Sequence, residues 1–93
     1  MVVASELSML REKAVLLKAL SNPVRLCIVR ELLRRGECNV SSMQVCLDLS
    51  QSTVSQHLGR LRDVGIITGE RKKTAVYYRV SSKEAADVIT ALF

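Results

Sequence analysis

The stretch SQSTVSQHLGRLRDVGI, from Ser50 to Ile66, constrains the fold more than any other part of the chain. Its apolar residues Val54, Leu58 and Leu61 recur at intervals of four and three, the spacing of one helix face. The residues between them carry side chains that donate or accept hydrogen bonds. A helix of this kind packs against a core along one stripe and offers a polar face to a partner.

The residues before this stretch predict a shorter helix and a tight turn. Ser41 or Ser42 is the expected N-cap of that helix, which continues through Leu47. The tripeptide DLS then forms the turn, and Ser50 is the expected N-cap of the longer helix. Two helices joined by a turn this short form a helix-turn-helix arrangement.

Two further helices are expected at the start of the chain. The first covers residues 5–20, with Ser5 as its N-cap. Its apolar positions at helical spacing are Leu7, Leu10, Ala14, Leu17 and Leu20. The second is capped by Ser21 or Asn22 and covers about residues 23–36. It is apolar over much of its circumference, so we expect it to be the central buried helix.

Beyond Gly65 the pattern changes from helix to strand, because β-branched and aromatic residues become frequent. We expect two antiparallel strands, at residues 66–70 and 75–80, with a basic tip between them. A final helix over residues 83–93 has an apolar face, formed by Ala86, Val88, Ile89, Leu92 and Phe93. Residues 37–40 are too few for more than an extended connection or a minimal strand. The expected fold class is therefore mainly α with a β-hairpin (α+β).

Composition places these elements in one small domain covering residues 1–93. Hydrophobic residues make up 48% of the chain and aromatic residues 3%, so its core must be aliphatic. A domain of this size is marginally stable, and burial of more surface in a dimer would stabilise it. The net charge of +5 favours an anionic partner, nucleic acid before membrane, although a basic protein without such a partner remains an alternative.

The chain shows no apolar run long enough to span a membrane and no signal peptide, so no membrane partner is expected. Its three cysteines are an odd number in a chain without an export signal. This usage is typical of reduced thiols in a cytoplasmic protein rather than of a disulfide framework.

Three segments together resemble the ArsR/SmtB family of winged helix-turn-helix repressors. They are LKALSNPVRLCIVREL at 17–32, SQSTVSQHLGRLRDVGII at 50–67 and AVYYRV at 75–80. The resemblance covers nearly the whole chain and implies a homodimeric repressor that binds a palindromic operator in double-stranded DNA. In this family the hairpin is the wing, and an inducer releases the DNA.

The resemblance gives the polar helix face a role, because such a helix can lie in the major groove with its outer side against base edges. The expected base readers are Gln51, Ser52, Thr53 and Gln56, and Ser55, His57 and Arg60 are placed for phosphates or the groove edge. Alternatively, Ser52 and Ser55 only solubilise the face. For His57, the only histidine, helix packing or a phosphate contact is favoured over metal ligation.

The resemblance also implies roles for the wing and for the two terminal helices. Arg71, Lys72 and Lys73 suit a wing laid along the flanking DNA backbone, although any exposed turn can be charged. The family's dimer forms from its first and last helices. Here these are the leucine stripe of residues 7–20 and Val88, Ile89, Leu92 and Phe93, whose alternative role is the core of a monomer.

Neither metal site of the family can be assembled here, so no metal cofactor is expected. The thiol pair of one site falls on Asn39 and Ser41, and the Asp/His pair of the other falls on Ser82 and Glu84. Thiol chemistry remains, and the candidate redox residues are Cys27, Cys38 and Cys46. Because Cys27 and Cys46 fall on apolar helix faces, they can equally be core atoms. Control without any direct inducer is a further alternative.

Rival classes are an enzyme and a protein-docking module. The sequence shows no Ser/His/Asp constellation and no glycine-rich phosphate loop, so an enzyme is not expected. A winged-helix protein-interaction module without sequence-specific DNA binding is the alternative, and it would not require the polar face together with the basic hairpin.

Overall fold

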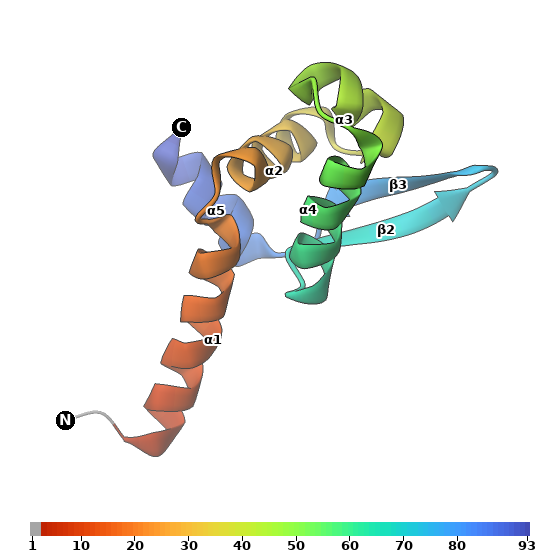
Figure 1. Ribbon diagram of the computed structural model, residues 1–93. Coiled ribbons are helices and arrows are strands. Elements are labelled where there is room, and N and C mark those ends of the chain that lie inside the picture. The colour runs from red at the N-terminus through yellow and green to blue at the C-terminus, as the bar shows by residue number, and fades with distance from the viewer. Residues whose placement is uncertain (1–2) are drawn as a thin grey trace.

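The computed structural model describes residues 3–93 and contains the elements in the expected order (Figure 1). They are α1 (Ala4–Leu20), α2 (Pro23–Arg35), β1 (Cys38–Asn39), α3 (Val40–Leu47), α4 (Gln51–Asp63), β2 (Ile67–Lys72), β3 (Ala75–Val80) and α5 (Lys83–Leu92). The predicted fold class, helices with a β-hairpin wing, is confirmed.

Two of the predicted helix starts have the predicted caps. The Asn22 side chain accepts hydrogen bonds from the backbone N–H groups of Val24 and Arg25, and Pro23 occupies the first turn of α2. The Ser50 hydroxyl accepts a hydrogen bond from the backbone N–H of Thr53 at the start of α4. These side chains satisfy N–H groups that have no partner within the helix.

Two other predicted caps are wrong. Ser5 lies inside α1, and the N-cap residue, Val3, makes no side-chain capping bond. The helix α3 begins before both candidate serines, because the Asn39 side chain already accepts a hydrogen bond from the backbone N–H of Ser42. An asparagine at the end of a strand caps as well as a serine does, so the helix begins at the first polar residue able to cap it.

The core is built around α2, as predicted. Its Ile28, Val29 and Leu32 are buried, as are the α4 stripe, Ala85 and Ile89 of α5, and Ala19 and Leu20 at the end of α1. Ile89 corrects one expectation, because it belongs to this core and is 2% exposed rather than lying on a dimer surface. Leu92 and Phe93, one turn further on, are exposed.

The three strands form one antiparallel sheet in the order β1-β3-β2. The first hairpin strand runs from Ile67 to Lys72 instead of over residues 66–70, and Lys72 pairs with Ala75. The tip is therefore a two-residue turn in which Lys73 has a φ of 59°, and Arg71 and Lys72 lie on the strand. A Cβ at Gly69 on β2 would lie 2.9 Å from the Tyr78 ring and from the Val76 side chain, so a larger residue there would force these side chains to shift.

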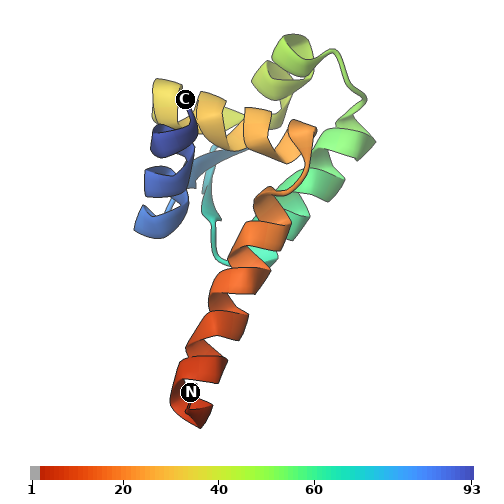
Figure 2. The same ribbon diagram turned by 90° about the vertical axis from the view of Figure 1, so that its left-hand side faces the viewer.

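The helix α1 extends away from the other elements like an arm, and the hairpin projects from another side (Figures 1 and 2). The molecule consequently measures 50 × 27 × 22 Å. Most of the arm's apolar side chains are exposed, including Leu7, Leu10 and Leu17. Within residues 3–93, no helix combines the length and the apolar character needed to cross a membrane.

Candidate nucleic-acid interface

The helix α4 has one buried face and one polar, exposed face. Val54, Leu58 and Leu61 are almost completely buried against the core. On the other side Gln51, Ser52, Ser55, Gln56 and Arg60 are exposed. The buried stripe fixes the rotation of the helix about its axis, so the polar side chains must point outward together.

Thr53 is only half-exposed, because it takes part in the cap of α4. The Ser50 hydroxyl donates a hydrogen bond to the Thr53 hydroxyl over 2.9 Å and accepts one from the Thr53 backbone N–H over 3.2 Å. The Thr53 side chain is thus held at the helix start, where several backbone N–H groups point outward. Such a helix start attracts an anion.

His57 is also half-buried and contacts another helix. Its Nδ1 lies 3.4 Å from Nη1 of Arg25 on α2. Burial, and then the positive charge of Arg25, lower the pKa of His57 below its ordinary value of 6.5. The ring is therefore neutral at pH 7, and its neutral nitrogen can accept a hydrogen bond from the guanidinium.

The three basic residues of the wing are all exposed but differ in their partners. Lys72 Nζ lies 3.0 Å and 3.1 Å from the two carboxylate oxygens of Glu37, and this ion pair raises the pKa of Lys72. The same ammonium lies 5.6 Å from the centroid of the Tyr77 ring. Within residues 3–93, Arg71 and Lys73 have no ion-pair partner.

A groove of about 240 Å³ connects the start of α4 with the wing. Its walls come from the start of α3, from Gln51 and from the beginning of β3. The lining residues are Asn39, Val40, Ser41, Gln51, Thr74, Ala75, Val76 and Tyr78. Of the predicted base readers, Gln51 lines this groove, and it does so together with Thr74 at the turn of the wing.

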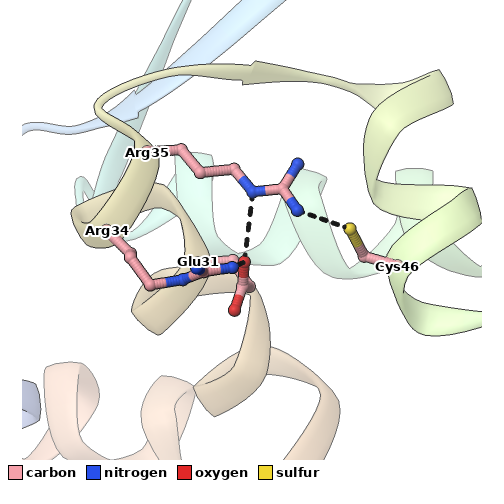
Figure 3. Close-up of polar contacts among 4 residues, drawn as sticks. All are labelled: Glu31, Arg34, Arg35 and Cys46. Carbon is pink, nitrogen blue, oxygen red and sulfur yellow. Dashed lines mark hydrogen bonds and ion pairs between the residues drawn. The ribbon is translucent and has the colours of Figure 1, made fainter.

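The cysteines have three different environments, since Cys38 is buried, Cys27 is half-buried and Cys46 is exposed. The expectation that Cys46 lies on an apolar helix face is wrong, because the short helix α3 buries only Met43 and turns its other side to solvent. Arg35 lies between two partners there (Figure 3): its Nη2 donates to the Cys46 sulfur over 2.9 Å.

The second partner of Arg35 is Glu31, whose carboxylate lies 3.2 Å from Arg35 Nε and 2.6 Å from an Arg34 nitrogen. The two guanidinium groups lower the pKa of Glu31. The redox role of the cysteines stays a prediction. Among residues 3–93, no three His, Cys, Asp or Glu side chains are grouped so that they could hold a metal ion.

Sequence reasoning missed the residues that hold these surfaces in place, namely Arg25, Arg35 and Glu37. Arg25 contacts His57 and Glu37 contacts Lys72, both far along the chain, and Arg35 contacts Cys46 on the next helix, so no periodic pattern indicates these pairs. The one available signal was the segment SNPVR, whose asparagine and proline were assigned to the helix start while Arg25 received no role.

The pair α3–α4 followed by the hairpin β2–β3 defines a winged helix-turn-helix protein. The family model for a helix-turn-helix domain matches residues 20–70. The biofilm growth-associated repressor of Agrobacterium fabrum is 40% identical over 82 residues, which cover 88% of this chain and 69% of the relative.

Solved structures agree with this fold. Reduced HlyU from Vibrio cholerae matches with a TM-score of 0.89 and 36% identity over 97% of this chain and 94% of that one. The homodimeric winged helix-turn-helix DNA-binding domain of a possible ArsR-family regulator from Mycobacterium bovis matches with a TM-score of 0.85 and 26% identity, over 99% of this chain and 84% of that one. The chain belongs to the ArsR/SmtB family of winged helix-turn-helix transcriptional regulators.

Proposed function

We propose that this chain works as a homodimer that binds a palindromic DNA operator and represses transcription. One observation carries the proposal: α4 is locked into the core by Val54, Leu58 and Leu61, and its outer face is polar and exposed. A helix fixed in this way can enter the major groove with its N-terminal residues against base edges.

The polar residues of α4 divide between bases and backbone in this proposal. Gln51, Ser52, Thr53 and Gln56 read bases near the helix start. A glutamine amide can bond adenine through two hydrogen bonds, and a threonine methyl can contact a thymine methyl. Ser55 and Arg60 lie at the groove edge or on phosphates, and the half-buried His57 lies at the groove edge, where it contacts Arg25 of α2.

The wing residues Arg71 and Lys73 contact the flanking DNA backbone, and Lys72, which pairs with Glu37, contributes less to this contact. Contacts of this kind contribute affinity that depends on salt and little on sequence. The net charge of +5 supports this part of the proposal, since it attracts any DNA before a specific site is found.

A dimer is needed because two recognition helices must reach successive major grooves about one DNA turn apart. The exposed apolar side chains of α1, together with Leu92 and Phe93, supply the surface for the second copy. The homodimeric structure from M. bovis supports this assembly.

Repression is the favoured outcome of binding, although a close relative acts in the opposite direction. The A. fabrum relative is named a repressor, whereas HlyU of V. cholerae, 41% identical over 78 residues, is named a transcriptional activator. A promoter that carries the operator in front of a reporter gene shows whether the protein represses or activates transcription. Lower reporter output with the protein than without it is expected, and higher output would reverse the assignment.

The rival proposal, a winged-helix module that docks only proteins, predicts no sequence preference. We infer a regulator that performs no catalysis and that works in the cytoplasm with reduced thiols. Its relatives are named as regulators of transcription, which favours DNA as the partner.

The test begins with selection of binding sites from random duplex DNA by the wild-type dimer. Gln56→Ala should then weaken binding to the selected duplex by about 1–3 kcal/mol and change binding to random duplex little. The matched control, Gln44→Ala on α3, should leave both affinities unchanged. An unaltered preference in the Gln56→Ala variant would remove that residue from the base readers, and failure to select any duplex would favour the docking module.

A further inference from the structure

Arg25 lies where three helices meet, and its side chain contacts two of them from the third. From the first turn of α2, its Nε donates a hydrogen bond to the Ala19 carbonyl near the end of α1. Its Nη1 lies 3.4 Å from Nδ1 of His57 on α4. One guanidinium therefore connects the arm with the helix that carries the polar face.

The contact with Ala19 is favourable for two physical reasons. The last four carbonyl groups of a helix lack partners within the helix, and the Ala19 carbonyl is one of these in α1. In addition, a cation near a helix C-terminus interacts favourably with the helix dipole.

The contact with Ala19 is one of a few that attach α1 to the rest of the protomer. Only Ala19 and Leu20 of the helix are buried in the core. Leu16 packs against the same core, and Lys13 forms an ion pair with Glu84 on α5, so the direction of the arm depends on these contacts together with the bond from Arg25 to the Ala19 carbonyl. A planar guanidinium with fixed donor directions restricts that direction more strongly than a lysine could.

We propose that Arg25 is a positioning residue that fixes the recognition helix α4 relative to the dimer arm α1, with His57 as the acceptor on α4. The inference rests on the proposed DNA-binding function. In a dimer joined through α1, a change in the angle between α1 and α4 is doubled across the two-fold axis. The spacing of the two recognition helices, and hence the fit to a palindrome, depends on that angle.

The proposal also predicts how pH acts on the contact. Nδ1 of His57 accepts a hydrogen bond only while the ring is neutral, and a protonated ring would place a second positive charge beside the guanidinium. Burial, and then the positive charge of Arg25, lower the pKa of His57. The helix α3, which packs beside α4, has no charged side chain.

The direction in which the pKa of His57 is shifted decides at which pH the Arg25–His57 contact is lost. The pKa of His57 in the folded protein lies below its ordinary value of 6.5, so folding favours the neutral ring. The contact is fully present above pH 6.5 and is lost as the pH falls through the folded pKa.

The first experiment needs no DNA. His57 is the only histidine, so its ring protons give one titration curve by NMR in the intact protein. Arg25→Met keeps an unbranched apolar stem as far as the position of Nε and removes the charged guanidinium, and the measured pKa of His57 should rise towards 6.5. The matched control is Arg30→Met on the same helix, whose guanidinium lies over the exposed Phe93 ring, and it should leave the pKa of His57 unchanged. Equal titration curves for wild type and Arg25→Met would show that Arg25 does not contact His57 in solution.

The second experiment measures binding to the duplex selected by the wild type. Arg25→Met should lose about tenfold more affinity for this duplex than Arg30→Met does, while both lose the same small affinity for random duplex. Arg25→Lys, which retains the charge and is the safer variant for folding, should not restore the affinity. Equal losses in Arg25→Met and Arg30→Met would overturn the positioning role.

The pH profile of the same binding separates positioning from a direct DNA contact. The affinity of the wild type for the selected duplex should fall as His57 is protonated. The control is the pH profile of His57→Gln, whose neutral side chain does not titrate, and this profile is subtracted from that of the wild type. Affinity that rises on protonation would place His57 on a phosphate and overturn the proposal. If the wild type selects no duplex, the proposed function fails and the positioning role in DNA recognition fails with it, while the NMR titration still decides whether the Arg25–His57 contact exists.

Discussion

The helices α1 and α4 both repeat leucines at helical spacing, but α4 buries its whole stripe, whereas α1 buries only Leu20 at its end. Leu58 and Leu61 are 1% and 0% exposed, whereas Leu10 and Leu17 are 48% and 53% exposed. Other parts of the same protomer cover the stripe of α4, whereas the exposed part of the α1 stripe can be covered only by another molecule, such as the second copy in a dimer. A periodic apolar pattern therefore shows that a helix has a face to bury and leaves open what covers that face.

The same contrast occurs between two neighbouring lysines of the wing. Lys72 pairs with Glu37 of its own chain, and within residues 3–93 no acidic partner is found for Lys73. Charges satisfied within the protomer stabilise the wing, and charges left outward are available to DNA.

The largest expected effect comes from the buried stripe of α4 and is a loss of folding stability. Leu58→Ala removes a fully buried side chain and should lower the free energy of unfolding by about 2–5 kcal/mol. The matched substitution on the arm, Leu10→Ala, should cost the monomer much less, because its side chain is already half-exposed. Urea denaturation at protein concentrations where the dimer has dissociated measures both. Equal losses would mean that α1 packs on its own protomer.

The comparison also explains which parts of the molecule could be predicted from the sequence. The α4 stripe, the cap at Ser50 and the strand at Ala75–Val80 depend on local pattern and were predicted correctly, and the cap of α2 is Asn22, one of the two residues expected there. The cap of α3, the burial of Ile89 and the exposure of Cys46 depend on which neighbour packs against each element. Local pattern carries no information about that neighbour.

The candidate site divides in the same way. The outward face of α4 follows from its period, so its residues were found from the sequence. Arg25 and Glu37 act through partners that are distant in the chain, His57 and Lys72, and only the fold brings these pairs together. Long-range polar contacts of a single side chain leave no periodic trace in a sequence.

The next largest effect comes from the exposed stripe of α1 and is a loss of dimer affinity. Leu17→Asp places a charge on the exposed stripe of α1 and should raise the dissociation constant of the dimer about 10- to 100-fold, because burying an unpaired charge at an interface is costly. Operator affinity should fall with it. The control is Ser8→Asp, which adds the same charge on another side of the arm. Sedimentation over a range of protein concentrations measures the dimer, and an unchanged dissociation constant for Leu17→Asp would remove α1 from the interface.

The smallest effect distinguishes the two wing lysines. A lysine that contacts a phosphate releases one bound counterion, so its removal should reduce the slope of log affinity against log salt by about 1. Lys73→Asn should show this full reduction, and asparagine tolerates the positive φ of 59° at the turn. Lys72→Gln should reduce the slope by less, because its ammonium is already neutralised by Glu37. Lys83→Gln on α5, whose lysine pairs with Asp87, removes the same charge away from the wing and should leave the slope unchanged. Titrations of random duplex at several salt concentrations measure all three variants. Equal reductions for Lys72→Gln and Lys73→Asn would show that DNA displaces Glu37 from Lys72. The Lys72 ammonium, which is paired within the free protomer, would then contact a phosphate in the complex.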